Sequence, residues 1–185
     1  MTGKSKKLLI AVGGPKGSGK TDIIKDAVKK LVNFKIISTG RLLQRLSILK
    51  YQKNFIDLPS EEKTVIRDYY TKEVLDNDSN LILDIHFGEF EDGGYPCVIS
   101  NKIVPTISHF VLITNSTETI QNRRFLDMKD RRLDFVSTHL NVIGEEMLFN
   151  QLVQNNQSES LRIVNTDIKR STEQLVNFIQ NSTRI

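Results

Sequence analysis

Short unbroken runs of apolar residues recur along the chain, and longer segments with helical spacing of apolar residues separate them. The runs cover residues 8–12, 34–37, 81–85, 110–113 and 161–164. Unbroken apolar runs of this length are typical of strands that are buried on both faces of a parallel sheet, because half-exposed strands alternate apolar and polar residues instead. The pattern therefore predicts five buried parallel strands.

Helical spacing marks the segments between these runs. The segment after Pro59 opens with Glu61 and Glu62, which favour the first turn of a helix. A later segment lies behind Ser171-Thr172-Glu173-Gln174, which has the pattern of a capping box at a helix start. Three helical faces are apolar, formed by Val65, Ile66, Tyr69, Tyr70 and Val74, by Val136, Leu140, Ile143 and Met147, and by Leu175, Val176 and Ile179. Strands that alternate with such helices predict a three-layer, doubly wound α/β fold.

Chain length and charge narrow the picture further. With 185 residues, 38 % of them hydrophobic, the chain is long enough for one domain with a real core and too short for two of usual size. We therefore expect residues 1–185 to form a single domain. Its 26 basic and 22 acidic residues are interspersed, which argues against a nucleic-acid partner. The basic cluster of Lys4, Lys6 and Lys7 either leads into the first strand or forms an RNA-binding arm.

Cysteine content and hydropathy bear on the compartment. Cys97 is the single cysteine, so the chain has no disulfide framework and suits a reducing compartment. The first apolar run has only the length of a strand, so we expect neither a signal peptide nor a membrane span. These features predict a cytoplasmic protein with no membrane partner.

Residues 14–21, Gly-Pro-Lys-Gly-Ser-Gly-Lys-Thr, lie between the first apolar run and a helix-forming segment. Glycines let the backbone turn its N–H groups inward onto phosphate oxygens, and the following helix directs its positive dipole end to the same place. This stretch therefore predicts a P-loop. Lys20 is expected to reach the terminal phosphates of the ligand, and the Thr21 hydroxyl to bind Mg²⁺. The expected nucleotide-binding residues here are Gly14, Gly17, Ser18, Gly19, Lys20 and Thr21.

Asp84 ends the third apolar run. A carboxylate at the carboxyl end of a strand beside a P-loop can hold Mg²⁺, directly or through its waters. The alternative is an aspartate that caps a turn. We interpret Asp84 as a second magnesium ligand beside Thr21, and the sequence indicates no other metal.

Residues 123–134 hold four arginines in twelve positions, at 123, 124, 131 and 132. Arginine stabilises charge on a migrating phosphoryl group while a closing flap excludes water. This stretch is therefore interpreted as a lid, with an ordinary exposed helix as the alternative. Thr39 and Gly40 follow the second apolar run, where open α/β sheets place ligands, and are expected to contact a second substrate. Arg41 or Arg45 either binds the phosphate of that substrate or is a solvated helix residue.

These motifs together resemble the nucleoside monophosphate kinases, and most of all the archaeal-type adenylate kinases. In that family an Asp-x-His sequence ends the third strand, as in Asp84-Ile85-His86, and a loop with Gly-Tyr and proline follows, as in Gly94-Tyr95-Pro96. The family lid carries an arginine and then Arg-x-Asp, matched here by Arg123 and by Arg132-Leu133-Asp134. The resemblance runs over most of the chain, but only the P-loop is highly specific by itself.

The resemblance implies a five-stranded core, a mobile monophosphate-binding region near residues 38–75 and a lid near 124–136. It implies ATP with Mg²⁺ as donor, AMP as acceptor, and Lys20, Arg123 and Arg132 as catalytic residues. It also places His86 beside the substrate and Asn165 near the adenine-binding loop, and it implies a possible homo-oligomer, since family members are often trimers. Many adenylate kinases have an aspartate and an arginine where this chain has Arg41 and Gln44, so Arg45 is the candidate for the monophosphate.

Three functions stay open at this point. The first is transfer of a phosphoryl group from ATP to a nucleoside monophosphate, with AMP ahead of CMP, UMP and dTMP. The second is a kinase for a small hydroxyl acceptor, with Asp84 as its base. The third is an assembly ATPase with a ribonucleoprotein partner, which would use the basic N-terminus.

Overall fold

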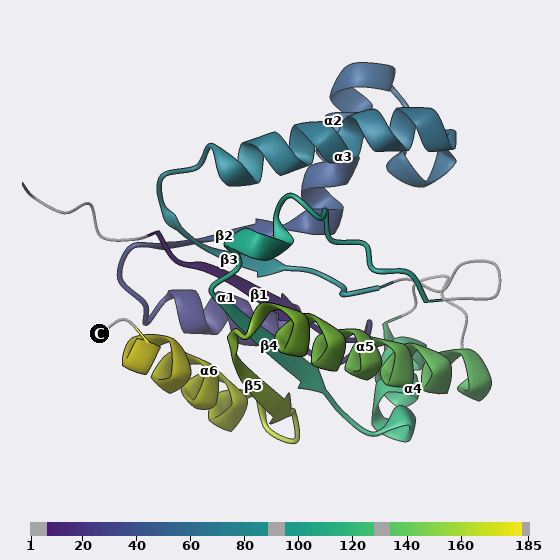
Figure 1. Ribbon diagram of the computed structural model, residues 1–185. Helices are drawn as coiled ribbons and strands as arrows, with labels where there is room; N and C mark the ends of the chain where they lie inside the picture. Colours follow the sequence, from purple (N-terminus) through teal and green to yellow (C-terminus); the bar gives the residue numbers. More distant parts are fainter. Residues whose placement is uncertain (1–6, 89–94, 128–133, 183–185) are drawn as a thin grey trace, which may run out of the picture.

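A parallel sheet of five strands forms the middle of the molecule (Figure 1), which a computed structural model describes over residues 7–88, 95–127 and 134–182. The sheet order is β2-β3-β1-β4-β5. In chain order the strands are β1 (Leu9–Gly13), β2 (Phe34–Ser38), β3 (Asn80–Asp84), β4 (His109–Thr114) and β5 (Glu159–Val164). All five predicted strands form, with small shifts at their ends. The predicted burial holds for β1, β3 and β4 but is wrong for β2 and β5, which are the edge strands of the sheet and are mostly half-buried or exposed.

Helices cover both faces of this sheet and complete three layers (Figure 1). One core cluster joins α1 (Lys20–Val28) and α6 (Ile168–Ser182) to one face. The other cluster joins α2 (Thr39–Tyr51), α3 (Ser60–Leu75) and α5 (Phe135–Asn156) to the opposite face. The remaining elements are α4 (Thr117–Leu126) and the short 3₁₀ helices η1 (Phe55–Asp57) and η2 (Val104–Thr106). The predicted three-layer α/β fold is confirmed.

The strand order determines which loops meet. β1 lies between β3 and β4, and its register pairs Val12 with Asp84. Because all the strands are parallel, the loops after β1, β2 and β3 leave the same edge of the sheet, where open α/β sheets bind ligands. The P-loop, Asp84 and the start of α2 therefore gather at one edge.

The helix α5 forms as predicted, but its predicted apolar face does not pack on the core. The exposed fractions of Val136, Leu140, Ile143 and Met147 are 66 %, 41 %, 39 % and 66 %. The buried side of α5 instead consists of Thr138, Gly144, Glu145, Phe149 and Leu152. A small residue such as Gly144 lets the helix approach its neighbours closely, and spacing alone cannot distinguish that side from the apolar one.

Two smaller predictions need correction. The helix α6 begins at Ile168, three residues before the predicted capping box, and its first turn is capped by Asp167, whose Oδ1 accepts the Arg170 N–H at 2.7 Å. Ser171 and Thr172 are buried inside the helix instead of capping it. On α3 the predicted apolar face is only partly buried, since Val65 and Tyr69 are exposed.

Within the described ranges, no helix has both the length and the apolar character that crossing a bilayer requires.

Candidate active site

The loop between β1 and α1 has the backbone of a phosphate cradle. Gly14, Gly17 and Gly19 have φ angles of 144°, 94° and 86°, a region that L-residues rarely adopt. At Gly19 an added Cβ would also lie 2.4 Å from the Asn165 Nδ2 atom. The N-cap residue of α1 is Gly19, which has no side chain to cap the N–H groups of the first turn. Such an uncapped helix start behind a glycine loop fits phosphate oxygens.

Lys20, Thr21 and Asp84 meet at the base of this loop. Asp84 Oδ1 lies 3.3 Å from Lys20 Nζ, and Asp84 Oδ2 accepts a hydrogen bond from the Thr21 hydroxyl at 2.8 Å. The described residues contain no group of three His, Cys, Asp or Glu side chains that could hold a metal by themselves. A hydroxyl and a carboxylate at this spacing fit Mg²⁺ that takes its remaining ligands from phosphates and water. The structure thus brings Lys20, which was predicted to reach the donor phosphates, together with Thr21 and Asp84, the two residues predicted to bind Mg²⁺.

Side chains from other elements hold the loop from outside. Arg123 donates to the carbonyl of Ser18 at 3.1 Å, and Asn165 Nδ2 donates to the same carbonyl at 2.7 Å. Arg124 Nε donates to the Lys16 carbonyl at 2.7 Å. These bonds fix outward carbonyl groups, which favours the inward orientation of the loop N–H groups. Arg123 and Asn165 thus contact the backbone of the P-loop, and their predicted roles toward the phosphoryl group and adenine stay predictions.

Arg124 has a defined structural place that the sequence did not reveal. It is 5 % exposed, on the last turn of α4, and its Nη1 donates to the Thr138 hydroxyl of α5 at 3.1 Å. This buried arginine joins α4, α5 and the P-loop. Residues 128–133 of the predicted lid, Arg132 among them, lie outside the described residues.

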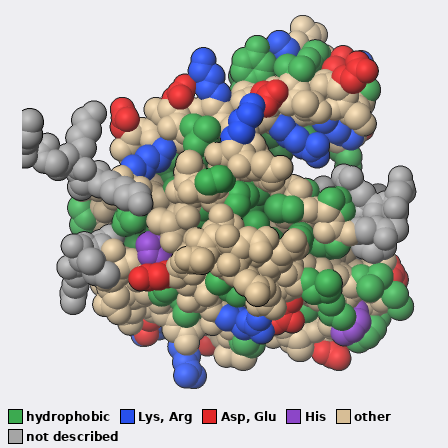
Figure 2. Space-filling view, in the orientation of Figure 1, with side chains coloured by type: hydrophobic (Ala, Val, Ile, Leu, Met, Phe, Trp, Pro, Cys, Tyr) green, Lys and Arg blue, Asp and Glu red, His purple; other side chains and the backbone are tan. Residues whose placement is uncertain are grey.

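A cavity of about 350 Å³ lies next to the P-loop and carries several cationic groups. Lys16, Lys20 and Arg67 line it, together with the carboxylate of Asp84. Figure 2 shows basic side chains on the lobe that α2 and α3 form, beside a hollow between this lobe and the rest of the molecule. A cationic cavity beside the phosphate cradle is suited to an anionic second substrate.

The predicted substrate-binding residues divide between this cavity and its surroundings. Thr39, Gly40 and His86 line it. Arg45 does not. It forms an ion pair with Glu73 at 2.8 Å and lines a neighbouring cavity of about 380 Å³, which shares Thr21, Ser38 and Asp84 with the first.

Arg67 is, with Lys16, one of two cavity cations to which sequence reasoning assigned no role. It lies on α3 with its guanidinium carbon 5.8 Å from the centre of the Phe55 ring, and among the described residues no carboxylate pairs with it. It also lines a neighbouring cavity of about 310 Å³ that shares Thr39 with the first. One signal in the sequence could have located Arg67: it lies three residues before Tyr70, so the two share a side of the helix, and Tyr70 is buried.

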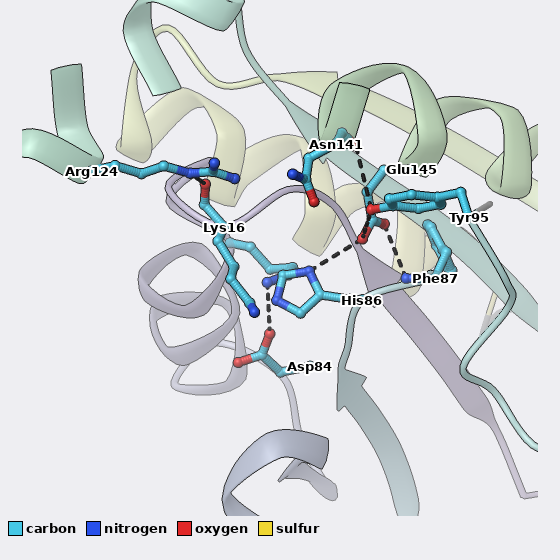
Figure 3. Close-up of polar contacts among 9 residues, drawn as sticks. Lys16, Asp84, His86, Phe87, Tyr95, Arg124, Asn141 and Glu145 are labelled. Atoms are coloured by element: carbon cyan, nitrogen blue, oxygen red, sulfur yellow. Dashed lines mark hydrogen bonds and ion pairs between the residues drawn. The ribbon is translucent and has the colours of Figure 1, made fainter. Parts of the chain in front are cut away.

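His86 and Glu145 form a polar pair in the wall of the cavity (Figure 3). Glu145 Oε1 lies 3.2 Å from His86 Nδ1 and 3.4 Å from the Tyr95 hydroxyl, and Oε2 accepts the Phe87 N–H at 3.0 Å. Burial lowers the pKa of His86, the charge of Lys20 lowers it further, and Glu145 opposes both effects. Glu145 was missed because a charged residue in a helix is normally expected on its solvent side.

The ring of Tyr95 occupies a slot that only glycines leave open. A Cβ added at Gly88 or at Gly144 would lie 2.6 Å from the Tyr95 ring. Gly88 also pairs with Cys97 in an isolated antiparallel bridge. The segment after β3 is therefore held against α5 beside the cavity.

Comparison with solved structures shows the fold to be a shared one. The chain is similar to a shikimate kinase from Bacteroides thetaiotaomicron, with a TM-score of 0.57 and 17 % identity over 94 % of this chain and 98 % of that one. It is also similar to a shikimate kinase from Acinetobacter baumannii in complex with shikimate, with a TM-score of 0.61 and 12 % identity over 95 % and 94 % of the two chains. At such identities the likeness shows that the chain shares a kinase-type P-loop fold. It does not bear on the substrate.

Sequence comparison is informative at the level of the family. No curated protein matches the chain. A family model described as an AAA domain, AAA_17, matches residues 12–140, which include the P-loop, Asp84, Arg67 and His86. This family is broader than the archaeal-type adenylate kinases, so the resemblance to that group stays a prediction. Because the match covers well over half of the chain and nearly all of the site, the protein belongs to this AAA-domain family of P-loop proteins.

Proposed function

We propose that the protein is a Mg²⁺-dependent kinase that transfers the terminal phosphoryl group of ATP to a nucleoside monophosphate, with AMP as the first candidate. The observation that carries this proposal is the cationic cavity beside the P-loop, which Lys16 and Arg67 line. A phosphate monoester carries a charge of about −1.5 to −2 at neutral pH, so it suits such a cavity. Its oxygens are already anionic, so the acceptor needs no protein base.

The donor side of the reaction falls to the residues of the P-loop. When Mg²⁺ and ATP are bound, Thr21 and Asp84 would hold the metal, which would neutralise charge on the phosphates. Lys20, now paired with Asp84 at 3.3 Å, would bind phosphate oxygens instead. Backbone N–H groups of residues 17–21 would hold the donor phosphates, and Lys20 would stabilise charge on the transferring group.

The acceptor side is assigned to the residues between β2 and β3. Residues 38–75 would form the acceptor-binding region, in which Arg67 binds the acceptor phosphate and Thr39 and Gly40 contact the rest of the molecule. The neighbouring cavity of about 310 Å³, which Arg67 also lines, provides room for the part of the acceptor away from its phosphate. Residues 124–136 with Arg132 would form the lid that excludes water from the site.

A kinase for a hydroxyl acceptor is the second candidate, and the His86–Glu145 pair favours it. A carboxylate that holds one ring nitrogen leaves the other available to take a proton from a hydroxyl group. Such an acceptor would work without a phosphate of its own. The two candidates therefore differ in whether the acceptor must carry a phosphate.

A matched comparison of acceptors tests the proposal. ADP formation from ATP would be measured with AMP, CMP, UMP, dTMP, adenosine and shikimate. We expect turnover with a monophosphate and none with adenosine. Arg67→Gln should raise the KM of the acceptor about 10–100-fold, since it removes a charge-assisted hydrogen bond, whereas Arg45→Gln should change it little. Turnover with adenosine or shikimate that equals or exceeds turnover with every monophosphate would contradict the proposal.

A further inference from the structure

Glu145 is an acidic residue in an unusual environment. Its side chain is 0 % exposed, although it lies on a helix whose opposite face is open to solvent. A buried carboxylate is strongly unfavourable unless hydrogen-bond donors surround it. Glu145 has such donors, since Oε2 accepts the Phe87 N–H at 3.0 Å and Oε1 faces His86 Nδ1 and the Tyr95 hydroxyl.

The contacts of Glu145 determine where His86 carries its proton. A carboxylate in its ionised form can only accept hydrogen bonds, and a histidine that faces it across the 3.2 Å contact then donates through Nδ1. The Nε2 atom is then the ring nitrogen that presents a lone pair. His86 lines the cavity, and Figure 3 shows its ring with the Nδ1 edge toward Glu145 and the other edge toward Lys16 and Asp84.

We infer that Glu145 is a positioning residue that holds the ring of His86 in one orientation and one tautomer, so that Nε2 accepts a hydrogen bond from the acceptor substrate. This inference rests on the proposed function, because it takes the cavity as the acceptor site. The group recognised is a hydrogen-bond donor on the acceptor, either a hydroxyl or an N–H. His86 thus selects for such a donor, and Lys16 and Arg67 select for negative charge.

A purely structural role for Glu145 makes a different prediction. Through Phe87 and Tyr95 the carboxylate also joins α5 to the segment after β3, and Tyr95 fits between Gly88 and Gly144. If this were its whole role, its loss would lower stability and weaken ATP and acceptor alike. A positioning role through His86 instead weakens the acceptor selectively.

Glu145→Gln is the test variant, because glutamine keeps the shape and can still accept the Phe87 N–H. Its amide group can also donate to His86 Nδ1, so the ring is no longer held with its proton on Nδ1. We expect the acceptor KM to rise about tenfold while the KM for ATP stays within about twofold. Glu146→Gln is the matched control, since the neighbouring Glu146 pairs with Arg162 at the surface, and its two KM values should stay at the wild-type level.

A double-mutant cycle shows whether Glu145 acts through His86. His86→Gln alone should raise the acceptor KM as much as Glu145→Gln does, and the double variant should be no worse than either. Additive effects of the two substitutions on the acceptor KM would overturn the inference. A parallel rise in the KM values for ATP and for the acceptor would also overturn it. Should Glu145→Gln not fold, the comparison of His86→Gln with the wild type on the acceptor KM still decides whether the imidazole contacts the acceptor.

The tautomer itself can be measured without turnover. Proton–nitrogen correlation spectra of ¹⁵N-labelled wild-type protein at about pH 8, where the ring is neutral, should show the His86 proton on Nδ1 and none on Nε2. The opposite tautomer would overturn the inference. These spectra need no acceptor, so they test the positioning of His86 independently of the proposed function. Failure of the proposed function would instead appear as an absence of turnover with every monophosphate.

Discussion

Replacing Gly19 by alanine perturbs the P-loop at the point where the backbone and Asn165 meet. Gly19 has a φ of 86° and a ψ of 7°, in the left-handed region that an L-residue occupies at a cost of about 1–2 kcal/mol. The new Cβ would also lie 2.4 Å from Asn165 Nδ2. Asn165 must then move, and its 2.7 Å bond to the Ser18 carbonyl would be lost. Gly19→Ala should therefore lower the free energy of unfolding by about 2–3 kcal/mol.

Gly40→Ala is the matched control. An added Cβ at Gly40 would meet no atom within 4 Å, and the residue lies in the first turn of α2 without a positive φ. Alanine favours a helix over glycine by up to about 1 kcal/mol, so this variant should be as stable as the wild type or slightly more stable.

Urea denaturation followed by far-ultraviolet circular dichroism measures both variants, since the chain has no tryptophan for a fluorescence signal. Titration calorimetry with ATP and Mg²⁺ should show weaker binding for Gly19→Ala, because the cradle is distorted. If Gly19→Ala unfolds at the same urea concentration as Gly40→Ala and binds ATP as tightly as the wild type, the assigned loop geometry is wrong.

Three further predictions concern charged and titratable side chains. Asp84→Asn should raise the Mg²⁺ concentration needed for half-maximal turnover at least about tenfold, because the carboxylate is lost from the metal site; an unchanged Mg²⁺ requirement would exclude Asp84 as a ligand. Arg124→Gln removes the buried charged donor to the Lys16 carbonyl and should lower the free energy of unfolding by about 2–3 kcal/mol in urea titrations, whereas a change below about 0.5 kcal/mol would refute the bracing role. Burial lowers the pKa values of His86 and His109, so the unfolded chain binds more protons than the folded one, and the free energy of unfolding decreases as the pH is lowered below about 6.5. A variant with both histidines changed to glutamine should therefore lose less stability than the wild type between about pH 7.5 and 5.5. Equal losses would contradict this prediction.

The donor half of the site could be predicted from the sequence because its signals are local. The glycine spacing around Lys20 and Thr21 specifies a backbone shape over eight consecutive residues. Asp84 could be added because unbroken apolar runs indicate a parallel sheet, in which the ends of neighbouring strands share one edge. The structure then shows Asp84, at the end of β3, 2.8 Å from the hydroxyl of Thr21 in the first turn of α1.

The acceptor half could not be predicted in the same way, because it depends on how distant helices pack. Glu145 and Arg67 lie on helices, where a charged residue is expected at the surface. Only the packing of α5 and α3 brings Glu145 against His86 and Arg67 to the cavity. The apolar stripe with Leu140 favoured the wrong face of α5 for the same reason. Periodicity reveals that a helix has two sides, but tertiary packing decides which side is buried.

In the proposed reaction, the terminal phosphoryl group of ATP passes to the phosphate of an acceptor. The most direct measurement follows ATP labelled in its terminal phosphate, mixed with Mg²⁺, the protein and AMP, and separates the products by chromatography. We expect the label to appear in the terminal phosphate of newly formed ADP, and we expect Lys20→Ala to lower this transfer by orders of magnitude while leaving the fold intact. Label found only in inorganic phosphate, or transfer that Lys20→Ala leaves unchanged, would contradict the proposal.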